Sequence, residues 1–349
     1  MKKFFRDIHI WLSIPLGLVV SVACFTGAAL VFEKEISALA NSRLYEAPHA
    51  PGQRMMAPEA VAEALQRQMP DSMPLTRLTV GKAEGEAWMA LFKGAGKRQM
   101  SVNPYTGRAQ GWVETPRFFK TVRSLHRYLL DSPGGKGRMS AGKFIVGVAT
   151  IAMSFVLLSG VVIWWPRNRK VAANRLKVSL SKGWRRFWHD THVSLGVYAA
   201  AFLLLMSLTG PTWSFGWYRD AAYGLFGADT SRPKDGAAAH TAKAEIDKGK
   251  GRKGGKGARK PGEEARKEGK DGDLDYEIVV KGSHGKGPKD RSAEVRQLFY
   301  SLHTGTWGGT ATKVAYVLAA FIGGCLPLTG YYLWIRRKFA GRLAVQPAA

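Results

Sequence analysis

The sequence predicts a mainly α-helical membrane protein, with four transmembrane helices from two related two-helix halves and a small α+β outer module. Three observations predict this class: long uncharged runs, an internal repeat, and an alternating segment between the first two runs. Each run exceeds the roughly 20 apolar residues that cross a bilayer as a helix. The four runs are Ile8–Phe32, Phe144–Pro166, Thr191–Tyr218 and Val314–Ile335.

The repeat relates the first run to the third. Both copies read Asp, one residue, His, sixteen residues, then Thr-Gly. A single histidine at the mouth of an apolar run is a weak signal, but two at the same offset indicate a duplicated site. The copies are Asp7, His9, Thr26, Gly27 and Asp190, His192, Thr209, Gly210.

A looser match relates the second run to the fourth. Ser-Leu-His precedes each run, ending at His126 and at His303. Each run then carries a hydroxyl residue, a glycine and, four residues after the glycine, a tryptophan. These are Ser159, Gly160, Trp164 and Thr329, Gly330, Trp334.

Basic residues beside the runs predict the orientation. The N-terminus, the loop between runs two and three, and the C-terminal tail are rich in Lys and Arg, and in a four-span chain all three lie on one side. By the positive-inside rule both termini are cytoplasmic and the two long loops face outward. The first run has 25 residues and exceeds the usual signal-peptide core of about 7–15, so it is interpreted as an uncleaved span.

The chain therefore divides into eight predicted segments. They are transmembrane helix 1 (1–33), an outer α+β module (34–143), transmembrane helix 2 (144–166), a basic cytoplasmic loop (167–188), transmembrane helix 3 (189–218), an outer segment (219–312), transmembrane helix 4 (313–336) and a cytoplasmic tail (337–349).

Within the two outer segments the residue patterns differ. In the first, residues 58–65 predict an amphipathic helix that starts at a proline, and residues 75–80, 87–94 and 98–112 predict antiparallel strands. In the second, residues 229–291 are dominated by Lys, Gly, Asp and Glu, a composition that predicts disorder. A strand near residues 273–282 is interpreted as the remnant of a second module.

Composition excludes several function classes. The formal charge is +26, but the basic residues lie beside apolar runs and in one Gly-rich insert, which argues against nucleic-acid binding. Two cysteines, Cys24 and Cys325, are too few for a four-cysteine zinc site or iron–sulfur cluster.

The four repeat-related histidines are the candidate cofactor-binding and metal-ligating residues, and no catalytic side chain is proposed. In a helical bundle, side chains on facing helices form cofactor sites, and two axial imidazoles hold a b-type haem. Pairing by depth puts His9 with His192 and His126 with His303, which predicts two haems. His189, three residues before His192, is a rival ligand. Packing or interfacial roles are the alternative for each histidine alone, and Arg123 and Arg127 are candidates to neutralise haem propionates.

Several stretches resemble the PepSY-associated transmembrane family of bacterial iron-regulated inner-membrane proteins. They are HIWLSIPLG, SLHRYLL, WHDTHVSLG, SLHTGTWGG and LTGYYLWIRR, while PEAVAEAL and VNPYTGRAQG resemble the PepSY module. The resemblance implies a b-haem protein of the bacterial inner membrane. It also implies a ferric-siderophore reductase, supplied by a cytoplasmic flavoprotein or a membrane quinol. No flavin domain and no GxGxxG fingerprint after a strand occurs in the chain.

Two alternatives stay open at this point. The outer module can bind a peptide or protein and regulate a protease or envelope partner, with the spans as an anchor. The chain can also be a transport subunit for an iron chelate or haem, although Asp, Glu, Lys and Arg are missing from the interiors of the runs, which argues against an aqueous path.

Overall fold

The computed structural model divides the chain into two compact units, and each is described by itself. The structure describes residues 1–349 except 82, 97, 133–137, 229–276, 281–290 and 344–349. One unit holds Met1–Asn41, Thr115–Ala228 and the chain from Lys289 onward. The other holds Ser42–Glu114 and the described part of 229–288. The predicted disordered segment, 229–291, lies almost entirely outside the described residues.

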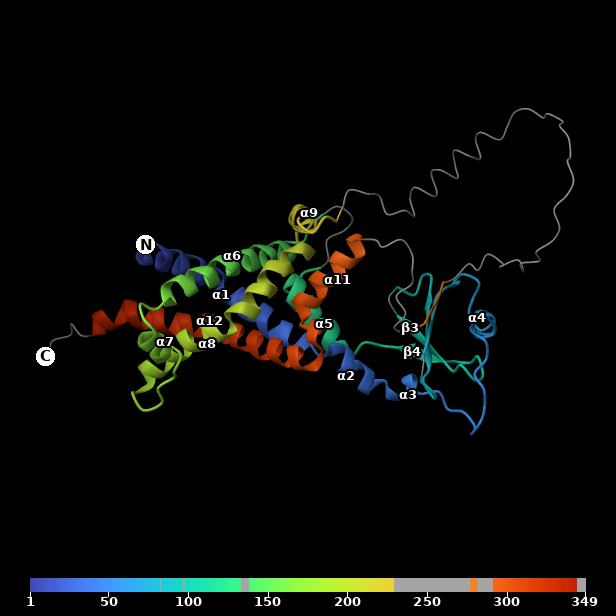
Figure 1. The fold of residues 1–349 in the computed structure, drawn as a ribbon. Coiled ribbons are helices and arrows are strands. Elements are labelled where there is room, and N and C mark those ends of the chain that lie inside the picture. The colour runs from blue at the N-terminus through green and yellow to red at the C-terminus, as the bar shows by residue number, and fades with distance from the viewer. Residues whose placement is uncertain (82, 97, 133–137, 229–276, 281–290, 344–349) are drawn as a thin grey trace, which may run out of the picture. The chain divides into compact units, whose positions relative to one another are not determined.

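Four long apolar helices form the first unit and confirm the predicted membrane class (Figure 1). Helices α1 and α8 each pack against both α6 and α12, so α1 and α8 lie on one diagonal of the bundle. The protein is therefore a multi-pass membrane protein with a lipid bilayer around these helices. The four are α1 (Lys2–Leu30), α6 (Ala141–Trp164), α8 (Trp184–Thr209) and α12 (Gly309–Leu343).

Shorter helices gather at the two ends of the bundle (Figure 1). The start of α1, the end of α12 and α7 (Arg169–Arg175) lie at one end. Helices α5, α9 and α11 lie at the other, and α2 leads away from α1 there. Their bounds are α2 Glu33–Ala40, α5 Arg117–Tyr128, α9 Gly216–Gly224 and α11 Arg291–Thr304, with single 3₁₀ turns at Gly210–Trp213 and Thr306–Gly308.

The third helix is shorter than its uncharged run. Helix α8 ends at Thr209, and Pro211 lies in the 3₁₀ turn that follows. Proline lacks the N–H that an α-helix needs and clashes with the preceding turn, so the run from Thr191 to Tyr218 is not one continuous helix. In contrast, Pro15 and Pro327 lie inside α1 and α12.

Small and hydroxyl-bearing residues hold the bundle together, as is usual in lipid. The Ser21 hydroxyl of α1 donates to the Gly324 carbonyl of α12 at 2.8 Å. The Ser154 hydroxyl of α6 donates to the Ser207 hydroxyl of α8 at 2.9 Å. Phe155 and other large apolar side chains are exposed and face the lipid.

The second unit contains the small α+β module. A helix, α4 (Pro58–Gln66), packs its buried residues Val61 and Leu65 on a sheet whose core includes Leu78 and Trp88. The sheet order is β4-β3-β2-β1-β5, with antiparallel pairing from β1 to β4. The elements are α3 (Ser42–Tyr45), β1 (Leu75–Val80), β2 (Trp88–Phe92), β3 (Gln99–Val102), β4 (Ala109–Val113) and β5 (Glu277–Val280).

Strand β5 corrects one interpretation of the sequence. It lies inside the predicted strand at 273–282, but it pairs in parallel with β1 of the first module, Leu78 opposite Ile278. The segment is therefore an edge strand of that single sheet rather than the remnant of a second module. Backbone N–H and C=O groups at the free edge of β1 find partners in this way.

Replacing Leu78 by alanine is expected to destabilise the module by about 2–5 kcal/mol, because a fully buried leucine leaves a cavity. Limited proteolysis of the detergent-solubilised protein should then cleave within 42–114 at a protease concentration that spares wild type. Thr76→Ala, on the exposed face of the same strand, is the control. Equal resistance of Leu78→Ala and wild type would contradict the assignment of this core.

Candidate functional site

Two pairs of histidine rings meet inside the membrane unit. The ring centres of His9 on α1 and His192 on α8 are 6.4 Å apart, with an angle of 84° between the planes. Those of His126 on α5 and His303 on α11 are also 6.4 Å apart, at 55°. We call these the first pair and the second pair. They join the residues that the sequence pairs by depth, while their role as iron ligands stays a prediction.

The two pairs lie at opposite ends of the bundle. The first pair is near the start of α1, and His126 contacts Thr26 near the end of the same helix. At 1.5 Å per residue, residues 9 and 26 are about 25 Å apart along the helix axis. The pairs are therefore separated by most of the thickness of a bilayer core, about 30 Å.

Each histidine is held through Nδ1 by a neighbouring helix in the same way. The Nδ1 of His126 lies 2.9 Å from the Ala23 carbonyl and 3.1 Å from the Thr26 hydroxyl. In all four cases the carbonyl belongs to the residue three before the hydroxyl. The others are His9 with Val156 (3.0 Å) and Ser159 (3.2 Å), His303 with Met206 (3.1 Å) and Thr209 (3.0 Å), and His192 with Leu326 and Thr329 (2.8 Å).

A glycine follows each hydroxyl residue, and the imidazole lies against it. A Cβ built on Gly27 would come within 3.2 Å of the His126 Cε1, and one on Gly160 within 3.3 Å of the His9 Cε1. A Cβ on Gly210 would come within 3.4 Å of the His303 Cε1, and one on Gly330 within 3.5 Å of the His192 Cε1. The hydroxyl–glycine dipeptides, at 26–27, 159–160, 209–210 and 329–330, thus allow each ring to lie directly on a helix backbone.

This arrangement sets the tautomer of all four rings. A carbonyl can only accept, so Nδ1 must carry the proton and donate it. The hydroxyl oxygen accepts from the same N–H while its own proton goes to a carbonyl of its helix; Ser159, for example, donates to Val156 at 2.8 Å. Every Nε2 is therefore left with a lone pair. Metal-ligating histidines are usually oriented by this kind of bond through the other nitrogen.

The ring spacing fits a metal between each pair. An imidazole nitrogen binds a metal at about 2 Å, so two such bonds and two ring radii give centres roughly 6 Å apart. Two neutral axial imidazoles and an apolar surrounding are what b-type haem requires. Within the described residues no group of three or more His, Cys, Asp and Glu side chains forms a conventional metal site. A haem needs only two axial ligands from the protein.

A cavity of about 490 Å³ opens beside the first pair. This is within the usual range of cofactor pockets. Its walls come from all four long helices and are mostly apolar. They include the two glycines that lie against His9 and His192. Among the lining residues are His9, His192, Gly160, Gly330, Leu203 and Trp164. The indole N–H of Trp164 is buried and has no partner in the described part of the chain.

Burial keeps the second pair neutral. It lowers the pKa of His126 below its ordinary value and, with the nearby His126 as a smaller cause, lowers that of His303 to about 4. Both imidazoles therefore lack a charge at pH 7 and keep an Nε2 lone pair. The ring of Trp213 lies 5.1 Å from that of His303 and closes one side of the pair.

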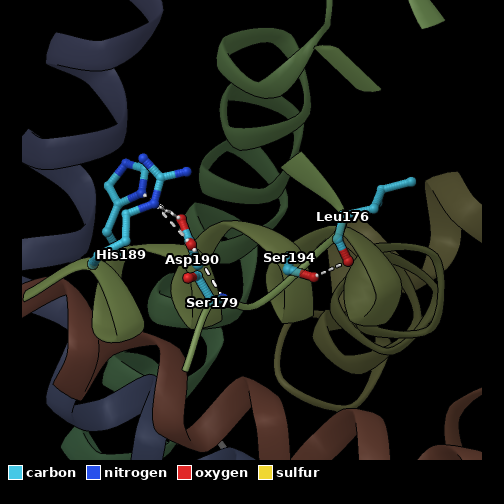
Figure 2. A network of polar contacts seen from close by, with 6 residues as sticks. Leu176, Ser179, His189, Asp190 and Ser194 are labelled. Carbon is cyan, nitrogen blue, oxygen red and sulfur yellow. Dashed lines mark hydrogen bonds and ion pairs between the residues drawn. The ribbon is translucent and has the colours of Figure 1, made fainter. Parts of the chain in front are cut away.

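The rival ligand His189 has a different environment (Figure 2). Its side chain is 56% exposed, and Nδ1 lies 3.3 Å from a carboxylate oxygen of Asp190. Asp190 is buried, accepts from the Arg186 guanidinium at 2.8 Å and lies near the Ser179 N–H. His189 also lines the first cavity, but His192 is the residue paired with His9.

The Asp190 network ties the basic loop to α8. Ser194 on α8 donates to the Leu176 carbonyl at 2.8 Å, beside the contact of Asp190 with Ser179 (Figure 2). Asp190 therefore contacts the basic loop and does not orient the His192 ring. Its repeat counterpart Asp7 is half exposed and lies 3.9 Å from Arg6. Asp7 is therefore a charge at the surface of the bundle, whereas Asp190 is a buried structural residue.

The arginines beside His126 point to other partners. Arg123 forms an ion pair with Glu33 of α2, and Arg127 is exposed with its guanidinium 5.6 Å from the centre of the Tyr128 ring.

The sequence alone did not predict the role of the hydroxyl–glycine dipeptides. Their positions were visible as repeat markers, but only the fold shows that each contacts a histidine from another helix.

These features define a class: a four-helix membrane protein with two buried histidine pairs at opposite ends of one bundle. Residues 6–337 match the family described as "PepSY-associated TM region". The chain therefore belongs to the PepSY-associated transmembrane family. A comparison with curated proteins found no match.

Proposed function

We propose that this protein is an inner-membrane b-haem protein that carries electrons across a bacterial membrane and reduces a ferric chelate, such as a ferric siderophore, in the periplasm. The observation that supports this most is that two pairs of histidines lie near opposite ends of the bundle. In each pair the ring centres are 6.4 Å apart. A membrane anchor gains nothing from four partly buried imidazoles whose Nε2 atoms are each left with a lone pair, because a polar atom removed from water is unfavourable unless it has a partner.

The residues have separate roles in this proposal. His9 and His192 would hold one haem through Nε2, and His126 and His303 would hold the other. The hydroxyl–glycine dipeptides orient the rings, and the apolar walls of the cavity exclude water. Haem supplies one-electron exchange between iron(III) and iron(II), which no side chain here offers.

The proposed direction of transfer is supported by charge. Basic residues of α7, the N-terminus and the α12 tail gather at the first-pair end, and by the positive-inside rule this favours a cytoplasmic position for that end. A quinol or reduced flavoprotein gives two electrons in turn at that side and becomes quinone or oxidised flavin. Each ferric ion takes one electron at the second-pair side, so two ferric chelates are reduced per donor, and protons are released from the donor alone.

The test is chelate reduction by reconstituted proteoliposomes. Haem-loaded protein is supplied with a membrane quinol, a ferric chelate is added outside, and iron(II) is trapped by a chromogenic chelator. We expect quinol-dependent formation of iron(II). His126→Ala is expected to stop it while quinol still reduces the remaining haem. Haem-loaded wild type that accepts electrons from quinol or dithionite but reduces no ferric chelate would overturn the reductase assignment.

The Thr329 hydroxyl is expected to tune the first haem. Thr329→Val removes the 2.8 Å contact with His192 Nδ1, which lowers the basicity of that ligand. We expect a haem affinity about tenfold lower at the first pair and a higher midpoint potential, because a less basic ligand stabilises iron(III) less. Redox titration measures the potential and titration of the haem-free protein with haem measures the affinity, with Thr329→Ser as the control that keeps the hydroxyl. Identical potentials for the valine and serine variants would contradict this role.

A second candidate function draws on the module, which forms its own compact unit with its own core. It can bind a peptide or protein and regulate a protease or envelope partner without redox activity. Binding of this kind should survive replacement of all four histidines by alanine, whereas electron transfer should not.

A further inference from the structure

A second cavity adjoins the first between α1 and α12. It has a volume of about 290 Å³ and shares Arg6, Ile10, Trp334 and Arg337 with the first. Asp7 and Lys338 complete its lining. The histidine cavity therefore continues to the surface of the bundle along this α1/α12 gap, and its mouth is lined by charged residues.

The gap has an excess of positive charge. Arg6, Arg337 and Lys338 face a single carboxylate, Asp7, which is half exposed and 3.9 Å from Arg6. An exposed pair at that distance neutralises little. Lys338 lies over the Trp334 ring, and Arg337 has no hydrogen bond or ion pair with any described residue. An anion is the ligand that such a gap would bind.

The internal repeat places a basic side chain at the equivalent position on α8, but the cations on that side already have partners. Arg6 lies three residues before His9, and its counterpart three before His192 is His189, which contacts Asp190 (Figure 2). The other basic residue lining that side, Arg175, donates to the Trp164 carbonyl. The α1/α12 gap, in contrast, has arginines that lack strong partners among the described residues.

We infer that the α1/α12 gap is a carboxylate-binding site, in which Arg6 and Arg337 take the two propionates of the porphyrin held by His9 and His192. The inference rests on the proposed function. A guanidinium matches a carboxylate with two parallel N–H donors, and such charge-assisted bonds are stronger than neutral ones. The apolar walls suit a porphyrin face, and the cationic gap suits its acidic edge. The first haem would thus be oriented by charge.

The experiment isolates the first pair in a His126→Ala background, purified without haem and then loaded. The probes are haem and its dimethyl ester, which has no free carboxylate. The variants are Arg6→Gln/Arg337→Gln and, as a matched control, Arg185→Gln/Arg336→Gln, two exposed arginines that line neither cavity. Haem loss to an excess of a scavenging globin gives the dissociation rate in nanodiscs of neutral or anionic lipid.

We expect the Arg6/Arg337 variant to release haem at least about tenfold faster than the background, the loss expected for a charge-assisted bond. The control variant should release haem at the same rate as the background. The dimethyl ester should dissociate from the background and from the Arg6/Arg337 variant at the same fast rate. Equal rates of haem and ester from the background would overturn the inference. An effect seen only in anionic lipid would overturn it in favour of a lipid phosphate. Absence of haem binding by both wild type and background would instead defeat the proposed function.

Discussion

Replacing either His9 or His192 by alanine is expected to remove the same one of two haems. Both rings belong to one pair, 6.4 Å apart, and a single remaining imidazole leaves the iron without its second strong axial ligand. The haem-to-protein ratio should fall from about two to about one in each variant, and the double variant should lose nothing further. Pyridine haemochrome assay of purified protein measures the ratio.

The second pair provides the reciprocal case. His126→Ala and His303→Ala should each lose the other haem, so a His9→Ala/His303→Ala variant should hold none. His189→Ala is the control and should keep both, because that ring is directed to Asp190. Loss of the same haem by His9→Ala and His303→Ala would show that the pairing is wrong.

A leucine at Gly27 is expected to abolish haem binding at the second pair while leaving the first intact. The built Cβ already lies 3.2 Å from the His126 Cε1, so a branched side chain must displace the ring from its contacts with Ala23 and Thr26. Small-to-large changes at such contacts force shifts of side chains and backbone. Difference spectra during a redox titration should show one component missing.

Occupancy of the first pair by haem reports that the Gly27→Leu protein has folded. Gly224→Leu is the matched control, since nothing lies within 4 Å of a Cβ built there. Gly210→Leu should give the same loss through His303. Retention of both haems by Gly27→Leu would contradict the role assigned to the hydroxyl–glycine dipeptides.

The sequence was sufficient to predict the helices and the pairing of the rings. Long uncharged runs can only be accommodated as helices in lipid, and the two-copy pattern of histidines implies equivalent places in two halves. Within the outer module, alternation placed β1 and β2 almost at their observed bounds. The sequence did not reveal that the α-helix within Thr191–Tyr218 ends at Thr209. A proline in an apolar run can lie inside a helix, as Pro15 and Pro327 do, or just after its end, as Pro211 does.

Other contacts between distant segments could not be predicted from the sequence. Ser159 and Gly160 are ordinary helix residues until the fold places them under His9. Strand β5 is separated from β1 by about two hundred residues, and only pairing of the two strands shows that they share a sheet. Asp190 likewise resembled Asp7 in sequence, yet burial and the Arg186 contact give it a different role.

The most direct test of the account is a reduced-minus-oxidised spectrum, with haem quantified per chain, of wild-type protein made with ample haem. We expect about two haems per chain, both six-coordinate and of b type, as bis-histidine ligation requires. A preparation that is folded but contains no haem, or one whose haem is unaffected when all four paired histidines are replaced, would contradict it.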